Sequence, residues 1–245
     1  MRIAIVSDIH GNGTAFEAVL ADLRRTSPDL ILHGGDVADG GSSPVKIVDR
    51  IRDLGWLGVV GNTDEMLFRA DSLGEFAKGS PHLGTLFAAI EEMAVWTREA
   101  LGEERLAWLR ALPRKQIHDR IALVHASPES LWRAPAHTAS DAELESVYSP
   151  LGQAVAIYGH IHRPFVRSVA GVRGASKMLV ANSGSVGLPY DGDRRAAYLL
   201  VDESGPAIRR VEYDVDRELK ALRACGLPHG DWVAKMLASG SPQIP

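Results

Sequence analysis

The chain has 245 residues, of which 45% are hydrophobic and 24% are charged, a composition typical of a globular protein rather than a disordered or fibrous one. Its 27 basic and 31 acidic residues give a formal net charge of −4, which offers no electrostatic case for non-specific nucleic-acid binding. The single cysteine, Cys225, excludes an intrachain disulfide and a cysteine-based zinc site. No apolar run approaches the ~18 residues of a membrane span, and Ile3–Val6 is too short for a signal-peptide core, so we expect a cytoplasmic protein.

Strand and helix patterns alternate in the first part of the chain. Short apolar, β-branched runs predict buried strands, and segments with apolar residues at helical spacing predict the helices between them. This alternation favours a βαβ core with a mostly parallel sheet. The expected elements are a strand at Ile3–Val6, a helix at Thr14–Arg25, a strand at Leu30–Leu32, a helix at Pro44–Leu54 and a strand at Leu57–Val60.

Consecutive helical patterns fill residues 64 to 112 and end at Pro113. They include helices expected at Leu86–Thr97 and Glu103–Leu112. So long a helical segment between two strands predicts a helical cap, inserted at about 64–113. We expect the whole chain, residues 1–245, to form a single domain that carries this insertion.

Strands resume after the cap, and their character then changes. Ile121–Val124 and Ala154–Tyr158 are expected strands on either side of a helix that Ser140 caps and that ends at Tyr148. Gly, Asp and Pro clusters separate the later short strands, a pattern that predicts an antiparallel meander. The expected later elements are strands at Phe165–Val169, Met178–Ala181, Ala196–Val201 and Ala207–Tyr213, and helices at Val215–Ala224 and Asp231–Leu237.

Five of these strands each end in a turn that carries Asp, Asn or His. Ligand sites in open α/β sheets form at the carboxyl ends of strands, so we expect five separate segments to deliver these side chains to one crevice. The predicted set is Asp8, His10, Asp36, Asn62, His125, His160 and His162.

Each member of the set has a simple structural explanation when taken alone. Asp8 is a possible helix cap, Asp36 and Asn62 are common turn residues, and His125 is a possible structural residue at a strand end. The two alternating histidines of Gly159–His162 are harder to explain by packing. The joint occurrence of all five segments, each after a strand, favours a functional site.

The donor types indicate transition metals. Imidazole and carboxylate together suit Mn, Fe, Ni or Zn rather than Ca or Mg. Seven ligands are too many for one ion that keeps an open position, so we expect two divalent ions, with Asp36 as the natural bridging carboxylate. Gly35, Gly61 and Gly159 precede ligands at tight turns where a side chain would often clash.

The motif order D-x-H, G-D, G-N, H and G-H-x-H resembles that of the calcineurin-like metallophosphoesterases, over roughly residues 1–201. The segments Asp8–Asn12 and Asn182–Gly192 are most similar to the small bacterial and archaeal single-domain members. The resemblance implies a four-layer α/β/β/α sandwich with two mixed sheets. It also implies that one metal takes Asp8, His10, Asp36 and His162 and that the other takes Asp36, Asn62, His125 and His160, with manganese favoured.

Many members of that family carry a His after the G-N pair, near the leaving group, where this chain has Thr63. Threonine cannot donate a proton as an imidazolium does. The departure therefore predicts slow hydrolysis of esters with poor leaving groups. We expect Asp36, Asn62 and His125 to act as catalytic residues as well as ligands.

The expected reaction is hydrolysis of a phosphodiester or phosphomonoester by hydroxide held between the two ions. Two divalent ions with Asp8 and Asp36 leave a positive core, which favours an anionic phosphorylated small molecule or nucleotide as substrate. The alternatives are a protein serine/threonine phosphatase or a dinucleoside polyphosphate hydrolase. A further alternative, from a different class, is a non-catalytic metal-binding interaction module.

Several neighbouring polar residues allow two interpretations. Asn12 is a candidate phosphate contact or a turn residue, and Asp64 is a candidate substrate-site residue, a partner of the ligands or a helix cap. Arg163 is a candidate phosphate contact or a surface cation. His33 either orients a ligand or simply ends a strand, and Asp191–Arg195 is most simply a solvated turn.

Overall fold

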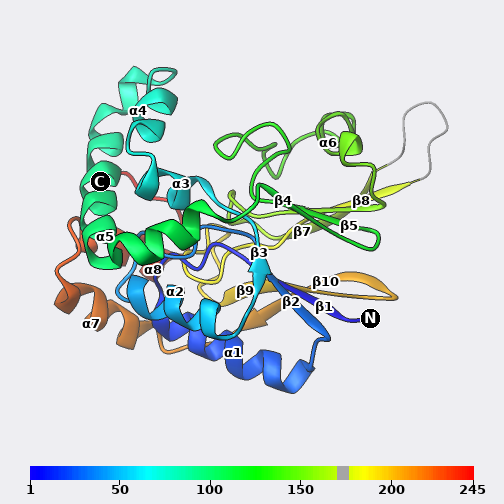
Figure 1. Cartoon of the computed structure of the whole chain (residues 1–245), viewed down its shortest axis with the longest axis horizontal. Helices are drawn as coiled ribbons and strands as arrows, with labels where there is room; N and C mark the ends of the chain where they lie inside the picture. Colours follow the sequence, from blue (N-terminus) through cyan, green and yellow to red (C-terminus); the bar gives the residue numbers. More distant parts are fainter. Residues whose placement is uncertain (170–176) are drawn as a thin grey trace.

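A computed structural model describes residues 1–169 and 177–245. Two five-stranded sheets stack against each other, and helices cover their outer faces (Figure 1). Both sheets contain parallel and antiparallel pairs, so the expected α/β sandwich with two mixed sheets is confirmed.

The first sheet is built around the N-terminal strand. β1 (Ile3–Val6) pairs in parallel with β2 (Leu30–His33), with Ile3 opposite Leu30. On its other side β1 pairs antiparallel with a strand from late in the chain. The sheet order is β10-β9-β1-β2-β3, and the remaining strands are β3 (Leu57–Gly58), β9 (Ala196–Asp202) and β10 (Gly205–Val211).

The second sheet has the order β4-β5-β6-β8-β7. Its central strands run parallel, and its two edge strands pair antiparallel to their neighbours. The strands are β4 (Lys115–His118), β5 (Ile121–Val124), β6 (Val155–Tyr158), β7 (Phe165–Val169) and β8 (Met178–Asn182).

The predicted antiparallel meander is wrong. β8 lies beside β6 and runs parallel to it, and β9 belongs to the other sheet. The segment between β8 and β9 therefore crosses from one sheet to the other. Of the four strands in the predicted meander, β7 pairs antiparallel with β8 and β9 with β10, but β8 and β9 are not neighbours. The apolar pattern of each strand was correctly interpreted, but it carries no information on which sheet the strand joins.

Helices occupy the outer faces and one end of the sandwich. Asn12 caps the first helix by accepting a hydrogen bond from the Ala15 amide at 2.9 Å, and Ser140 caps α6 by accepting one from Glu143 at 3.2 Å. The helices are α1 (Gly13–Thr26), α2 (Pro44–Asp53), α3 (Asn62–Phe68), α4 (Asp71–Ala77), α5 (Gly84–Arg110), α6 (Asp141–Tyr148), α7 (Val215–Cys225) and α8 (Gly230–Ser239), with 3₁₀ turns at Pro81–Leu83 and Ser149–Leu151.

The segment predicted as a cap forms α3, α4 and α5 between β3 and β4, at the end of the sandwich away from the N-terminus (Figure 1). α5 is interrupted at Gly102, whose φ of 67° and ψ of 167° are not helical. This break explains why the sequence pattern divides the segment into two helices. Among the described residues, no helix is both long and apolar enough to cross a membrane.

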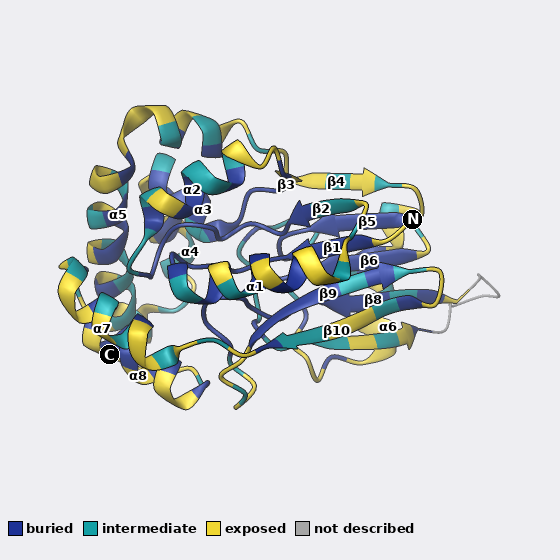
Figure 2. Cartoon of the chain, turned by 90° about the horizontal axis from the view of Figure 1, so that it is seen from below, coloured by how far each residue is buried: buried dark blue, intermediate teal, exposed yellow. Residues whose placement is uncertain are grey.

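The hydrophobic core lies in layers. Ile5, Leu32, Ile157 and Leu199 belong to a fully buried cluster of residues from both sheets. Figure 2 shows β1, β5, β6 and β9 as mostly buried strands, whereas β4 at the edge is largely exposed. The packed layers hold the carboxyl ends of the parallel strands in fixed positions, and the predicted polar turns follow those ends.

Candidate metal centre

The five predicted turns meet at one end of the two sheets. Asp8 and His10 follow β1, Asp36 follows β2, and Asn62 begins α3 shortly after β3. His125 follows β5, and the segment with His160 and His162 follows β6. Main-chain hydrogen bonds join the turns, for example from Asp8 N to Gly35 O at 3.0 Å and from Gly159 N to His125 O at 2.9 Å.

Five of the predicted ligand residues have left-handed backbone conformations. Asp8, His10, Asp36, His160 and His162 have φ values of 55°, 46°, 52°, 64° and 55°. Such values are uncommon for residues other than glycine, and they tend to occur where a tightly packed site imposes them. The sharp turns aim all five side chains into the same space.

Two glycines make the close approach of these turns possible. A Cβ at Gly61 would collide with the Asp36 carboxylate, and a Cβ at Gly159 would collide with the Asp8 carboxylate. The glycines noted in the sequence at these positions therefore leave room for the two acidic side chains.

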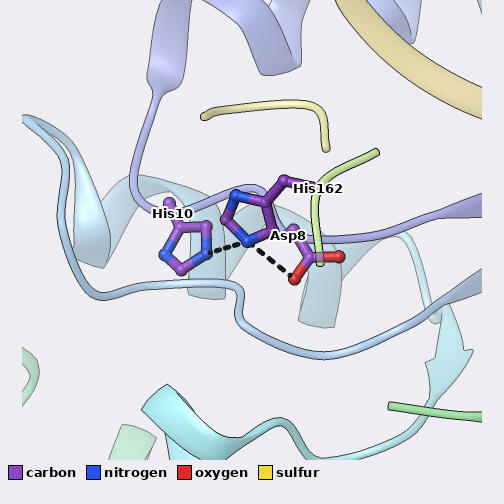
Figure 3. A group of neighbouring side chains, drawn as sticks. All are labelled: Asp8, His10 and His162. Carbon is purple, nitrogen blue, oxygen red and sulfur yellow. Dashed lines mark hydrogen bonds and ion pairs between the residues drawn. The ribbon is translucent and has the colours of Figure 1, made fainter. Parts of the chain in front are cut away.

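Asp8, His10 and His162 form one group (Figure 3). His162 Nε2 lies 3.1 Å from His10 Nε2 and 3.2 Å from Asp8 Oδ1. All three side chains are at least 90% buried. Their ligand atoms are close enough for one cation to contact all of them.

A second group adjoins the first. His125 Nε2 lies 2.8 Å from Asn62 Oδ1 and 3.4 Å from Asp36 Oδ2, and His160 Nδ1 lies 2.8 Å from the same Asn62 oxygen. Asp8, Asp36 and His125 also form a potential metal-binding group. Asp8 thus belongs to both potential groups. Asp36 Oδ2 lies 3.7 Å from His10 Nε2, so this oxygen faces His10 in the first group as well as His125 in the second.

The tautomers of three histidines follow from their outer contacts. The Nδ1 atoms of His10, His125 and His162 lie 2.8, 2.8 and 2.6 Å from the main-chain carbonyls of Asp39, Gly34 and Leu188. Because a carbonyl oxygen only accepts hydrogen bonds, each Nδ1 carries the hydrogen, and each Nε2 of a neutral ring presents a lone pair. These carbonyls also fix the ring orientations.

Two of the inward-facing atoms are consequently acceptors that face each other. The Nε2 atoms of His10 and His162 lie 3.1 Å apart, and when both rings are neutral in these tautomers no hydrogen lies between them. A cation between the two rings would make this arrangement favourable. His125 Nε2 lies 2.8 Å from the Asn62 oxygen, to which it donates a hydrogen bond when its ring is protonated. The residues present therefore fit divalent metal ions with mixed nitrogen and oxygen ligands.

The pKa values of the buried carboxyl and imidazole groups also show that this cluster favours positive charge. Burial raises the pKa of the Asp36 carboxyl, but His125 outweighs burial and holds that pKa well below its usual range. Burial lowers the pKa of His125, but the Asp36 carboxylate outweighs it and raises the pKa to about 10. Burial, with His125 nearby, lowers the pKa of His160 to about 4. The carboxylates thus stay ionised and attract a cation into the buried cluster.

Asp64 has a structural position behind the cluster. Its buried carboxylate accepts hydrogen bonds from the main-chain amides of Asp36, Val37 and Gly61 at 2.8, 3.0 and 3.0 Å. It therefore ties the Asp36 turn to the start of α3. Its contacts match the interpretations as a partner of the ligands and as a helix cap, rather than as a substrate contact.

Asn12 and His33 also lie in structural positions. The Asn12 side chain caps α1 and donates to the Gly187 carbonyl at 3.0 Å. The fully buried ring of His33 packs near Trp108, and neither ring nitrogen has a hydrogen-bond partner within residues 1–169 and 177–245. Burial alone lowers the pKa of His33 to about 4, so the ring is neutral near pH 7.

Arg163 and Thr63 remain available to a ligand. Arg163 is half-buried and makes no hydrogen bond or ion pair with the described residues. The Thr63 amide donates to Asp36 Oδ1 at 2.9 Å, while its buried hydroxyl has no partner among them.

Three residues that support the predicted ligands were not among the candidates predicted from the sequence. Tyr190 stacks on His162 with ring centroids 4.4 Å apart, and the Leu188 carbonyl fixes the same ring. Ser185 Oγ donates to the Asp8 carbonyl at 2.7 Å. Leu188, Tyr190 and Ser185 all lie in the segment Asn182–Gly192. The similarity of this segment to small phosphoesterases was the sequence feature that could have indicated its role.

Two stacked mixed sheets, with buried side chains that could hold metal ions converging at their strand ends, define an α/β sandwich protein with a candidate metal centre. The chain belongs to the calcineurin-like phosphoesterase superfamily, because the family profile of that domain matches residues 1–205. This result confirms the resemblance seen in the motifs.

Individual relatives extend over nearly the whole chain. An uncharacterized protein of Methanocaldococcus jannaschii is 32% identical over 255 aligned positions, which cover 97% of this chain and 98% of the relative. A metallophosphoesterase from Sphaerobacter thermophilus is similar in structure, with a TM-score of 0.78, 28% identity and coverage of 98% and 100% of the two chains. A hypothetical protein from Pyrococcus horikoshii shares the fold, with a TM-score of 0.81, 19% identity and 99% coverage of each chain.

Proposed function

We propose that this protein is a phosphoesterase that hydrolyses phosphomonoesters or phosphodiesters with two divalent transition-metal ions, manganese being favoured. The observation that carries the proposal is the opposition of lone pairs between His10 Nε2 and His162 Nε2 within a buried cluster of carboxylates and imidazoles. Membership of the phosphoesterase superfamily supports the same reaction class.

The two ions divide the seven residues between them. Asp8, His10, Asp36 and His162 would hold one ion, and Asp36, Asn62, His125 and His160 the other. The position of Asp36 Oδ2, 3.7 Å from His10 Nε2 and 3.4 Å from His125 Nε2, supports Asp36 as the bridging ligand. The proposed catalytic residues are Asp36, Asn62 and His125, because as ligands they would position the metal ion that activates the reacting phosphoryl group.

When bound, the ions supply Lewis-acid activation of water and of a phosphoryl oxygen. The chain's own contribution is to fix charge and geometry. Asp8 and Asp36 neutralise part of the four positive charges and leave a net attraction for an anionic phosphoryl group. The carbonyls of Asp39, Gly34 and Leu188 hold three imidazoles with their lone pairs inward.

Arg163 is the proposed phosphate contact in the chain. It directly follows the ligand His162, and its guanidinium is free of described partners. Asn12 and Asp64 are not proposed for this role, because main-chain groups already occupy their side chains.

The test is hydrolysis of p-nitrophenyl phosphate and bis(p-nitrophenyl) phosphate by protein reconstituted with Mn²⁺. Loss of an outer partner of a metal ligand costs 10–100-fold, so Asp36→Ala and His162→Ala should each lower kcat/KM by at least about a hundredfold. Asp36→Ala should lower the affinity for both metal ions, whereas His162→Ala should lower mainly the affinity for one. The exposed His137 provides the matched control, and His137→Ala should keep full activity.

The outcome separates an enzyme from a binding module. Turnover that needs the metal and disappears in both ligand variants supports the proposal. Full metal occupancy without turnover of either ester or of a wider phosphoester panel would contradict it and identify a non-catalytic metal-binding protein.

A further inference from the structure

A cavity of about 370 Å³ adjoins the proposed metal ligands. His10, Asn62 and His160 contribute to its lining, and so does Thr63. A group attached to a phosphate bound at these ligands would therefore have direct access to the cavity.

Apolar side chains from separate parts of the chain form most of the remaining lining. They come from α3, from the long helix α5, from the segment before α6 and from the C-terminal helix α8, and α5 and α8 lie near each other in Figure 1. The residues that matter most here are Met66, Phe87, Ile90, Met93, Trp132 and Met236.

Charged partners are scarce in this cavity. Among the described residues, no lysine or arginine lines it, and its only carboxylate is Asp39, which already accepts a hydrogen bond from Thr97 at 2.7 Å. A substrate with further phosphates would have to bury them without a cation, which is strongly unfavourable. A polypeptide or a nucleoside would likewise leave many polar groups without hydrogen-bond partners.

We propose that the substrate is a phosphate ester whose organic part is one large apolar group, an alkyl or alkylaryl chain, and that this group lies in the cavity. The inference rests on the proposed phosphoesterase function. A cavity of about 150 Å³ holds one benzene molecule, so the volume here admits a group of roughly ten or more carbon atoms. Two long acyl chains exceed this space, which favours a single-chain ester over a diacyl lipid.

Burial of each methylene in an apolar cavity should strengthen binding about three- to fourfold. The affinity of a ligand series should therefore rise steeply with chain length until the cavity is full. This dependence is measurable without hydrolysis, because alkylphosphonates have no ester bond to cleave.

The experiment titrates Mn²⁺-loaded protein with methyl-, butyl-, octyl- and decylphosphonate below their micelle concentrations. Binding is followed by calorimetry and by the fluorescence of Trp132 and Trp232, which both line the cavity. The Kd should fall on the order of a hundredfold from butyl- to octylphosphonate.

Ile90→Trp should fill the cavity, abolish the gain with chain length and leave methylphosphonate binding unchanged. Val95→Trp is the matched control, because Val95 lies on the same helix and is 39% exposed. Ile90→Arg should invert the preference, so that inorganic diphosphate binds more tightly than octylphosphonate. Thermal melting checks that each variant is folded.

An affinity that does not depend on chain length would overturn the inference, as would equal effects of Ile90→Trp and Val95→Trp. Tighter binding of inorganic diphosphate than of octylphosphonate by the unaltered protein would also overturn it. Chain-length dependence in a protein that hydrolyses no ester would support the apolar cavity as the binding site of such a group and contradict the proposed hydrolysis.

Discussion

His33 should make the protein sensitive to acid. Its imidazole is fully buried, and neither ring nitrogen has a hydrogen-bond partner among the described residues. Burial lowers its pKa from 6.5 to about 4. Between these two values the unfolded chain binds a proton at this position and the folded chain does not, so acid favours unfolding.

The size of the effect follows from these two pKa values. Going from pH 8 to pH 5, the free energy of unfolding should fall by about 2 kcal/mol through this residue alone. The contribution is fully present above pH 6.5 and is lost as the pH falls toward 4. In His33→Leu, which replaces the ring with an apolar side chain, this part of the pH dependence should disappear.

The assay is urea unfolding of metal-free protein at several pH values from 8 to 5, for the unaltered chain and for His33→Leu. Metal-free protein is used so that loss of ions in acid does not contribute, and His137→Leu at an exposed position is the control. The difference in stability between His33→Leu and the unaltered chain should change by about 2 kcal/mol over this range. A difference that is constant with pH would show that the pKa of His33 is not lowered in the folded protein.

Three further outcomes are expected. Asp64→Ala leaves the amides of Asp36, Val37 and Gly61 without their acceptor, so urea unfolding should show a loss of about 3 kcal/mol, and unchanged stability would count against the role of Asp64. Hydrolysis should fall on the acid side together with metal occupancy, because ligation needs neutral imidazoles; a fall at full occupancy would exclude ligand protonation as the cause. In a leaving-group series, rates should depend steeply on leaving-group pKa, and Thr63→His should accelerate the poorest leaving groups by about 10²–10⁴-fold, whereas a flat dependence in the unaltered chain would show that another residue supplies the proton.

The sequence predicted the polar turns well because each follows a strongly apolar strand. Ile3–Val6 and Ile121–Val124 were predicted with the bounds that the structure has, and His10 and His125 follow them as expected. Parallel strands bring their carboxyl ends to one edge, so the positions of the turns in space followed from the pattern. The roles of these residues in metal binding stay predictions.

Other features could not be predicted from local patterns. β4 is a short, partly polar edge strand, and its alternation in Lys115–His118 is too brief to identify. β8 joins β6 rather than β9 because of how the sheets stack, which no single segment encodes.

The cavity could not be predicted from the sequence either. Ile90 and Met93 have the spacing of core residues in a helix, and only the packing of α5 against distant segments shows that they line a space. The support of His162 by Leu188 and Tyr190 likewise depends on a loop that crosses between the sheets.

The proposed function requires that Asp8, Asp36 and the surrounding imidazoles hold two metal ions. Anomalous diffraction from crystals of the Mn²⁺-loaded protein tests it most directly. We expect two manganese peaks about 3.5–4 Å apart, with the Asp36 carboxylate touching both and His162 touching one. A single peak at saturating Mn²⁺, or two peaks without Asp36 as a ligand, would contradict it.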